Sequence, residues 1–422
     1  ILSGNQERLH SSMKDFKSPE YEAQTIRSPL VARTRDLNGA AGMEDSDGIW
    51  ATIAQFIEQL QANTYTSIEK ELATKGLLDL SKSRKDAKNA IGSHSQAIPL
   101  LVTLLRSGTT VVKINAALTL GVLCEEEDLR VKVLLGGCIP PLLGLLRSGS
   151  AEAQKAAAKA IYAVSHGGVA AEHVGMKIFM TEGVIPSLWD QLHPRHKQEK
   201  VVNDLLTGAL RNLCINTEGF WQATLEAGGV DILVRLIASG SSVAQSNASS
   251  LLASLMLASE TSCTKVLNSG AIQHLLKLVG PENEISARAE AAGALRTLSS
   301  KLRGAKKAMV DAGCIPILIS AIVAPSKEFM QGKPAQALQE NAMGALASIS
   351  GGMSAIVLSL GENIETFRSD SQVADILGAL AYALMVLNEK SDAAGPLDTA
   401  KIERLLVKQL RPRVSMQKQS VC

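Results

Sequence analysis

The chain has 422 residues and a formal net charge of +2, with 3% aromatic and 20% charged side chains. A charge this close to zero excludes a strong whole-molecule attraction to nucleic acid or to an anionic membrane. The six cysteines form no CxxC pair, so we expect buried thiols in a reducing compartment rather than disulfides or a metal site.

Residues 1–46 are polar, of mixed charge and without helical periodicity, so we expect a disordered leader. Residues 43–48, which begin with Met43, look like the start of a protein chain. We therefore expect that the residues before Met43 are never made into protein. Asp47 is expected to cap a helix that begins near Ile49, and Leu77 belongs to a second helix. This first unit is less regular than those that follow, as is typical of an end cap.

A short phrase then recurs along the chain. In its clearest copy, Gly136 and Gly137 end one helix, because glycine tolerates the left-handed conformation, and Pro140 begins the next. The branched residue of this phrase recurs every 41 to 46 residues, at Ile98, Ile139, Ile185, Val230, Ile272 and Ile315. A period of this length built only from helices is typical of an armadillo or HEAT array.

Each later repeat adds a long third helix. Six of these align, over residues 112–124, 153–165, 202–214, 244–256, 287–299 and 338–350. A seventh is expected at 374–386, after which the array is expected to be cut off. We therefore predict an all-α, armadillo-repeat, right-handed superhelical solenoid of about eight units over residues 47–411, the first one degenerate, followed by a disordered tail at 412–422.

No phosphate-binding, dinucleotide-binding, zinc-protease or serine-hydrolase motif is present, so neither a catalytic residue nor a cofactor is expected. An insertion at 193–200 contains His193 and His196, which have the chemistry of metal ligands. Because no cysteine or carboxylate partner stands at metal-binding spacing, a solvated basic loop is the better interpretation.

The working surface of a solenoid is usually its concave face, which the third helices are expected to line. Columns four, seven and eleven of their alignment share one stripe. The predicted partner-binding groove comprises Asn115, Lys159, Asn212, Asn247, Ser250, Ser254, Glu290, Thr297, Asn341 and Ser348. Such a groove suits a peptide held by hydrogen bonds, with close approach at the column-seven glycines. The alternative is that these residues are merely solvated helix positions.

As a class, the array resembles those of importin-alpha, the catenins and plant ubiquitin ligases. Importin-alpha would place Trp in column seven and Asn in column eleven, whereas here column seven has no Trp and column eleven only Asn212. This difference argues against a receptor for nuclear signals. A ubiquitin ligase would carry a U-box before the array, and the short leader cannot hold one.

A closer resemblance is to the plant cellulose synthase-interactive family. The stretches that carry it are 43–48, 92–97, 129–141, 217–221, 324–332 and 335–342, and the similarity extends from about Met43 to Arg413. The resemblance implies a non-enzymatic scaffold at the cell cortex that links plasma-membrane cellulose synthase complexes to cortical microtubules, with no nucleic-acid partner and no membrane insertion. A generic adaptor of ubiquitin-ligase or vacuolar type, binding an unrelated peptide, is the competing interpretation.

One group of basic residues is a candidate site for acidic tubulin tails. It consists of Arg288, Arg296, Lys301, Arg303, Lys306 and Lys307. A solvated helix face is the alternative, since runs of charge are common on exposed helices.

Overall fold

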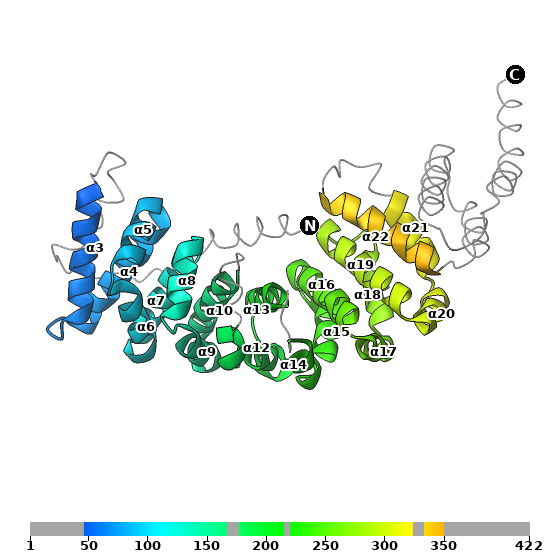
Figure 1. The fold of residues 1–422 in the computed structure, drawn as a ribbon, viewed down its shortest axis with the longest axis horizontal. Helices are drawn as coiled ribbons and strands as arrows, with labels where there is room; N and C mark the ends of the chain where they lie inside the picture. The colour runs from blue at the N-terminus through cyan, green and yellow to red at the C-terminus, as the bar shows by residue number, and fades with distance from the viewer. Residues whose placement is uncertain (1–45, 167–176, 215–219, 324–332, 350–422) are drawn as a thin grey trace, which may run out of the picture.

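The computed structural model describes residues 46–166, 177–214, 220–323 and 333–349. Within these ranges the chain forms helices and no strand, arranged as a shallow arch (Figure 1). The all-α armadillo solenoid predicted from the sequence is confirmed. The predictions for the leader up to residue 45, the third helix at 374–386 and the tail at 412–422 concern residues outside the described part.

The described helices fall into one degenerate unit and a series of repeats. The first unit comprises α3 (Ser46–Gln61) and α4 (Ser67–Ser83). The first helices of the later repeats are α5 (Lys85–Ser93), α8 (Glu127–Leu135), α14 (Phe220–Glu226), α17 (Glu260–Asn268) and α20 (Arg303–Asp311). The second helices are α6 (Ala97–Ser107), α9 (Ile139–Ser148), α12 (Val184–Leu192), α15 (Gly229–Ser239), α18 (Ala271–Val279) and α21 (Cys314–Val323). The third helices are α7 (Thr110–Leu123), α10 (Ala151–Ser165), α13 (Lys200–Leu213), α16 (Ser242–Ala258), α19 (Ile285–Lys301) and α22 (Lys333–Ile349).

The turn before five of the six described second helices depends on a glycine in the left-handed region. Gly270, for example, has φ 75° and serves as the N-cap of α18. The equivalent glycines are Gly137, Gly183, Gly228 and Gly313, with φ between 63° and 76°. In the first full repeat Gln96 takes this place with φ −99°, so this turn is made without the left-handed residue.

The turn between second and third helices carries its own signal, a glycine followed by a hydroxyl residue. The side chains of Thr109, Ser150 and Ser241 accept hydrogen bonds from the first-turn amides of α7, α10 and α16, respectively, at 3.1–3.3 Å. These N-caps satisfy amides that the helix itself leaves unpaired. Two predicted starts differ by several residues, since α3 begins at Ser46 rather than near Ile49, and α22 begins at Lys333 rather than at residue 338.

The core is continuous along the array. Column nine supplies its large side chains, and Leu120, Ile161, Leu210, Leu252 and Leu295 are each fully buried. Small residues let neighbouring third helices approach, as at Gly121, where an added Cβ would lie 3.3 Å from the backbone of Ala160. The cysteines of the described part are buried, as the sequence predicted.

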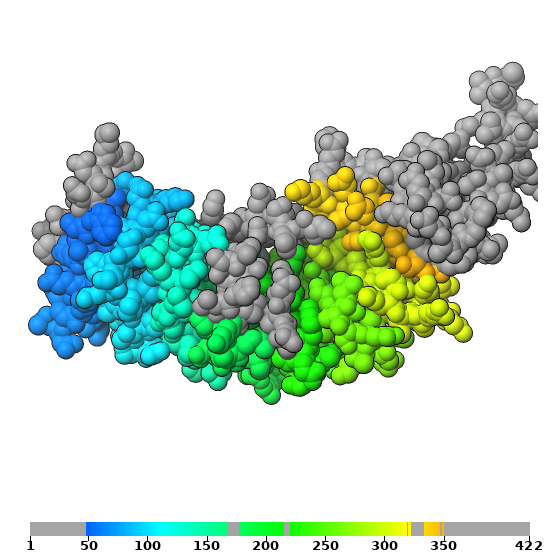
Figure 2. All heavy atoms as spheres, viewed as in Figure 1, coloured from blue at the N-terminus to red at the C-terminus, as the bar shows by residue number. Residues whose placement is uncertain are grey.

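This packing places the third helices on the inner side of the arch. In Figure 1, α10, α13 and α16 lie on that side, and their partners α9, α12 and α15 lie on the outer side. The space-filling view shows the same arch as one continuous body (Figure 2). Among the described helices, none is long and apolar enough to cross a bilayer alone; α8 and α9 meet those criteria only as a pair, with an 81° bend between them.

Candidate protein-binding surface

The ten residues of the predicted groove all lie on third helices, but none is fully exposed. Asn115, Lys159 and Asn247 are buried, and the other seven are partly buried. Many of these side chains form hydrogen bonds to a neighbouring helix, so the groove is built largely from contacts that hold adjacent repeats together. It is not a row of solvated positions.

Column-four asparagines link three of the described third helices, α7, α16 and α22, to an earlier helix on the inner side. Asn115 on α7 donates to the Thr74 hydroxyl on α4 at 3.2 Å. Asn247 on α16 donates to the Thr207 hydroxyl on α13 at 3.4 Å, and Asn341 on α22 donates to the Ala289 carbonyl on α19 at 3.0 Å. The same residue type at the same column therefore makes the same inter-repeat contact.

A second set of contacts between repeats comes from column ten, which was not part of the predicted groove. Arg211 on α13 donates to the side-chain oxygen of Asn247, and Arg296 on α19 donates to that of Asn341, both at 3.3 Å. Asn247 and Asn341 thus each receive a guanidinium from the preceding third helix. Arginine stands at column ten in α13 and α19 alone among the six aligned third helices, so the alignment signals this role only weakly.

Arg211 also reaches a second neighbour. Its Nη2 lies 3.6 Å from Oε1 of Glu290 on α19, so the contact passes over α16. Both side chains are less than one-fifth exposed. Burial raises the pKa of the Glu290 carboxyl, and Arg211 followed by a hydrogen bond from Ser250 partly offsets that shift.

The space beside the column-seven glycines is filled by side chains from neighbouring repeats. A Cβ on Gly208 would lie 2.7 Å from the Tyr162 ring, and one on Gly344 would lie 2.6 Å from Nε of Arg296. The space that the sequence analysis assigned to an approaching peptide is therefore occupied by the protein itself. Glycine at these positions permits close contact between repeats.

Column eleven has mixed roles. Asn212 bridges α13 to the end of α10, because its amide lies 3.0 Å from the Ser165 hydroxyl and 2.8 Å from Nδ1 of His166. Thr297 donates to the Gly293 carbonyl of its own helix at 2.9 Å. Ser254 forms a side-chain hydrogen bond with Cys214.

Three lysines at the other end of this surface affect one another, namely Lys82 on α4 and Lys155 and Lys159 on α10. Lys159 is 6% exposed, and burial together with Lys155 and then Lys82 lowers the pKa of its amine to about 8. Lys82 belongs to α4 and Lys159 to α10, so their charges influence each other across α7. On α4, Lys75 and Lys82 flank Asp79. Burial raises the pKa of the Asp79 carboxyl, and the charges of both lysines partly offset that shift.

The predicted basic patch is only partly assembled, and one of its members must be corrected. Arg288 is 2% exposed and donates through Nε to the Val279 carbonyl at the end of α18, so it contributes nothing to an exposed surface. Arg296 is exposed and bound to α22 through Asn341. The remaining four residues lie around the α19–α20 turn, namely Lys301, Arg303, Lys306 and Lys307.

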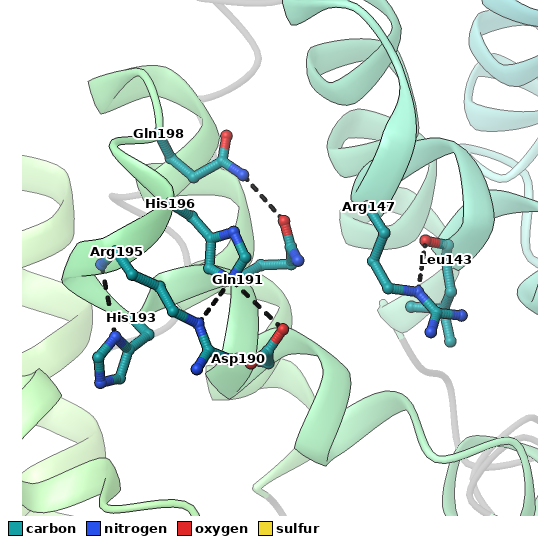
Figure 3. Close-up of polar contacts among 8 residues, drawn as sticks. All are labelled: Leu143, Arg147, Asp190, Gln191, His193, Arg195, His196 and Gln198. Carbon is teal, nitrogen blue, oxygen red and sulfur yellow. Dashed lines mark hydrogen bonds and ion pairs between the residues drawn. The ribbon is translucent and has the colours of Figure 1, made fainter.

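The histidine-containing loop after α12 is a polar cluster. His196 Nε2 lies 3.4 Å from Oδ2 of Asp190 and 3.1 Å from Nε of Arg195, which also pairs with Asp190 (Figure 3). The His193 ring points away from this group and accepts from the Arg195 amide at 3.4 Å. Throughout the described residues, no three His, Cys, Asp or Glu side chains are grouped to hold a metal ion.

Comparison with known proteins agrees with this geometry. The family model described as the plant U-box protein ARM repeat region matches residues 43–315. The chain therefore belongs to the plant armadillo-repeat family.

Two curated relatives from Arabidopsis thaliana narrow this class. The chain is 48% identical over 401 residues to the protein named CELLULOSE SYNTHASE INTERACTIVE 3, a match that covers 95% of this chain and 19% of that protein. It is 46% identical over 372 residues to CELLULOSE SYNTHASE INTERACTIVE 2, a match that covers 88% of this chain and 18% of that protein. The resemblance to the cellulose synthase-interactive proteins is confirmed, and the chain spans about a fifth of the length of these relatives.

Solved structures share the fold. A designed armadillo repeat protein matches with a TM-score of 0.51 and 23% identity, over 58% of this chain and 98% of its own. A second designed armadillo repeat protein, described in complex with the peptide (KR)4, matches with a TM-score of 0.50 and 22% identity. This match covers 60% of this chain and 99% of the designed protein. At this level of identity the similarity concerns the fold alone.

Proposed function

We propose that this chain is a non-enzymatic scaffold segment that binds cellulose synthase complexes and cortical microtubules. The observation that carries the proposal is the similarity to two proteins named for interaction with cellulose synthase, joined to a long inner surface built from third helices. By the same inference the chain acts at the cell cortex and needs no cofactor, nucleic acid or membrane insertion. The armadillo array is proposed to extend over residues 47–411.

The inner surface supports partner binding through polar side chains that remain partly accessible to solvent. The asparagines of column four are committed to neighbouring helices, so they fix the surface rather than recognise a ligand. Ser250, Thr297, Ser348 and the exposed Arg296 retain partial access to solvent on α16, α19 and α22. A rigid surface with a few accessible polar groups favours binding, because little side-chain freedom is lost when a partner docks.

Microtubule binding is assigned in this proposal to the α19–α20 turn. Lys301, Arg303 and Lys307 are exposed there, and Lys306 is partly exposed. Flexible acidic tails suit such a surface, because exposed lysines attract carboxylates without requiring a shaped pocket.

A second candidate function is a generic plant adaptor that binds an unrelated peptide. It is favoured by one observation, the match to a repeat region whose description names plant U-box proteins. The two candidates differ in what they bind, so one experiment separates them.

The test is a side-by-side pull-down of the 422-residue chain against cytosolic domains of cellulose synthase and against polymerised tubulin. Retention on the synthase domains, with a plant U-box partner domain as the negative bait, is the expected result. Retention on neither target would contradict the scaffold proposal for this segment.

A further inference from the structure

The inner surface contains the same pair of side chains twice, and one copy holds a carboxylate. In this first copy, Arg211 on α13 donates to the side-chain oxygen of Asn247 on α16 at 3.3 Å, and its Nη2 lies 3.6 Å from Oε1 of Glu290 on α19. Ser250, in column seven of α16, forms a side-chain hydrogen bond with the same carboxylate. A guanidinium that is held by an asparagine therefore binds a carboxylate that the chain itself supplies.

The second copy lies two repeats further along, on α19 and α22, which pack side by side (Figure 1). Arg296 on α19 donates to the side-chain oxygen of Asn341 on α22 at 3.3 Å. Both arginines stand in column ten and both asparagines in column four, so the two copies have the same register. Arg296 is exposed, however, and among the described residues no carboxylate pairs with its guanidinium.

The sequence explains why the second copy lacks a carboxylate in the same register. Glu290 is the column-four residue of the third helix that comes two after α13. In the repeat alignment, the corresponding residue two third helices after α19 is Leu377, which lies outside the described part of the chain. A leucine side chain cannot pair with a guanidinium, so the repeat pattern that supplies Glu290 to Arg211 supplies no carboxylate to Arg296.

We propose that Arg296 and Asn341 form a docking site for a glutamate or aspartate side chain of a partner protein, which takes the place that Glu290 occupies at Arg211. The proposal rests on the proposed scaffold function and names the chemistry that a partner needs at this point of the inner surface. Arginine suits this role, because its planar fork can donate two parallel hydrogen bonds to one carboxylate.

The guanidinium of Arg296 is already positioned for such a ligand. A Cβ on Gly344 would lie 2.6 Å from its Nε, so the side chain lies directly over the backbone of α22. The hydrogen bond to Asn341 uses Nη1, and no described residue accepts from the Nη2 side of the fork. Ser348, one turn beyond Gly344, is partly exposed and adds a hydroxyl to the same face of α22. A side chain that is held in place before binding loses little conformational freedom when the ligand docks.

The test uses the full chain and a trifluoroacetyl-capped heptapeptide that has one central glutamate between alanines and serines, with the corresponding glutamine peptide as its match. Fluorine NMR of the peptide gives the affinity, and the side-chain resonances of isotope-labelled arginine locate the site. We expect the Arg296 resonance to shift on addition of the glutamate peptide. The glutamine peptide should bind about tenfold more weakly, because the charge-assisted contact is lost.

Two variants test whether the copies are equivalent. Arg296→Gln should weaken binding of the glutamate peptide about tenfold. The control Arg106→Gln removes the same charge from an exposed position on α6 and should change the affinity by less than about twofold, as expected for a distant solvated charge. Glu290→Ala removes the carboxylate that the chain supplies to Arg211, so the Arg211 resonance should begin to shift with the glutamate peptide and a second site should appear.

Equal affinities for the two peptides, or equal weakening in Arg296→Gln and Arg106→Gln, would overturn the proposal. An Arg211 resonance that stays unchanged in Glu290→Ala would overturn it as well, because the two copies would then not be equivalent. So would sodium acetate that shifts the Arg296 resonance as much as the peptide does at equal concentration, because the site would then take a simple anion. Retention on the cellulose synthase or tubulin baits without binding of the glutamate peptide would reject this inference alone and leave the scaffold function standing.

Discussion

Arg211 and Glu290 belong to third helices that are two repeats apart, yet their side chains meet at 3.6 Å above α16. In a solenoid the ordinary contacts are between adjacent repeats, and stability is close to a sum of nearest-neighbour terms. This pair adds a term between second neighbours, and Asn247 on the intervening helix accepts from the same guanidinium. Three consecutive repeats are thereby coupled through one side chain.

We expect a measurable coupling between these two residues. Arg211→Met and Glu290→Gln, singly and together, should give an interaction free energy of about 0.5–1 kcal/mol in urea unfolding, a value reduced from that of a fully buried pair because both groups retain some solvent contact. The control cycle uses Lys85 and Glu126, which are 3.4 Å apart but largely exposed at the lysine, and should show no resolvable coupling. Additive effects in the Arg211–Glu290 cycle would refute the second-neighbour term.

Lys159 should make stability depend on alkaline pH. Its folded-state pKa of about 8 lies below the unfolded value, so the unfolded chain binds more protons between pH 8 and pH 10.5 and stability from this group rises with pH. The shift corresponds to roughly 3 kcal/mol over the full window. The melting-temperature difference between the native chain and Lys159→Met should move in favour of the native chain from pH 8 to pH 9.5, and a difference that does not change with pH would contradict this account.

The left-handed glycines should be irreplaceable even though space surrounds them. No atom lies within 4 Å of a Cβ built on Gly270, so Gly270→Ala tests backbone strain alone, and a loss of about 1–2 kcal/mol is expected. Gly304 in α20 is equally open and has no left-handed φ, so Gly304→Ala should stabilise by roughly 0.5–1 kcal/mol. Chemical denaturation of the two variants should shift the midpoint in opposite directions, and a shift in the same direction would contradict this account.

The tight fit between Tyr162 and Gly208 predicts a clash. Gly208→Ala places a methyl group 2.7 Å from the ring, and the loss of stability should be about 1–3 kcal/mol, as for other overpacked cores. In a Tyr162→Ala background the same change should cost far less, because the obstructing ring is gone. An undiminished cost in that background would place the strain elsewhere.

The α19–α20 turn is the proposed microtubule contact. Reversing Lys306 and Lys307 to Glu should weaken co-sedimentation with polymerised tubulin by about tenfold at low salt, because two attractive charges become repulsive. The matched control reverses Lys265 and Lys277, two exposed lysines on α17 and α18. Unchanged co-sedimentation in the Lys306–Lys307 variant would remove this turn from the proposal.

The repeat order, the positions of the third helices and the left-handed glycines were predictable, because each is encoded by a local residue type that recurs with the period. The inter-repeat contacts were not, since they depend on which side chains meet across helices. Arg288 illustrates the limit, because its position on a third helix gives no sign that its side chain turns to the Val279 carbonyl. Column ten was missed for a related reason, since Tyr162 covers Gly208 and Arg296 covers Gly344 without sharing chemistry.

The asparagine contacts also have a mechanical consequence. Asn115, Asn247 and Asn341 each tie a third helix to its predecessor along the inner side of the arch. These links resist elongation of that side, and straightening an arch lengthens its inner side, so a pulling force along the array would load these hydrogen bonds first. The arch would therefore resist flattening, and the spacing of the inner-surface side chains would change little until these links opened.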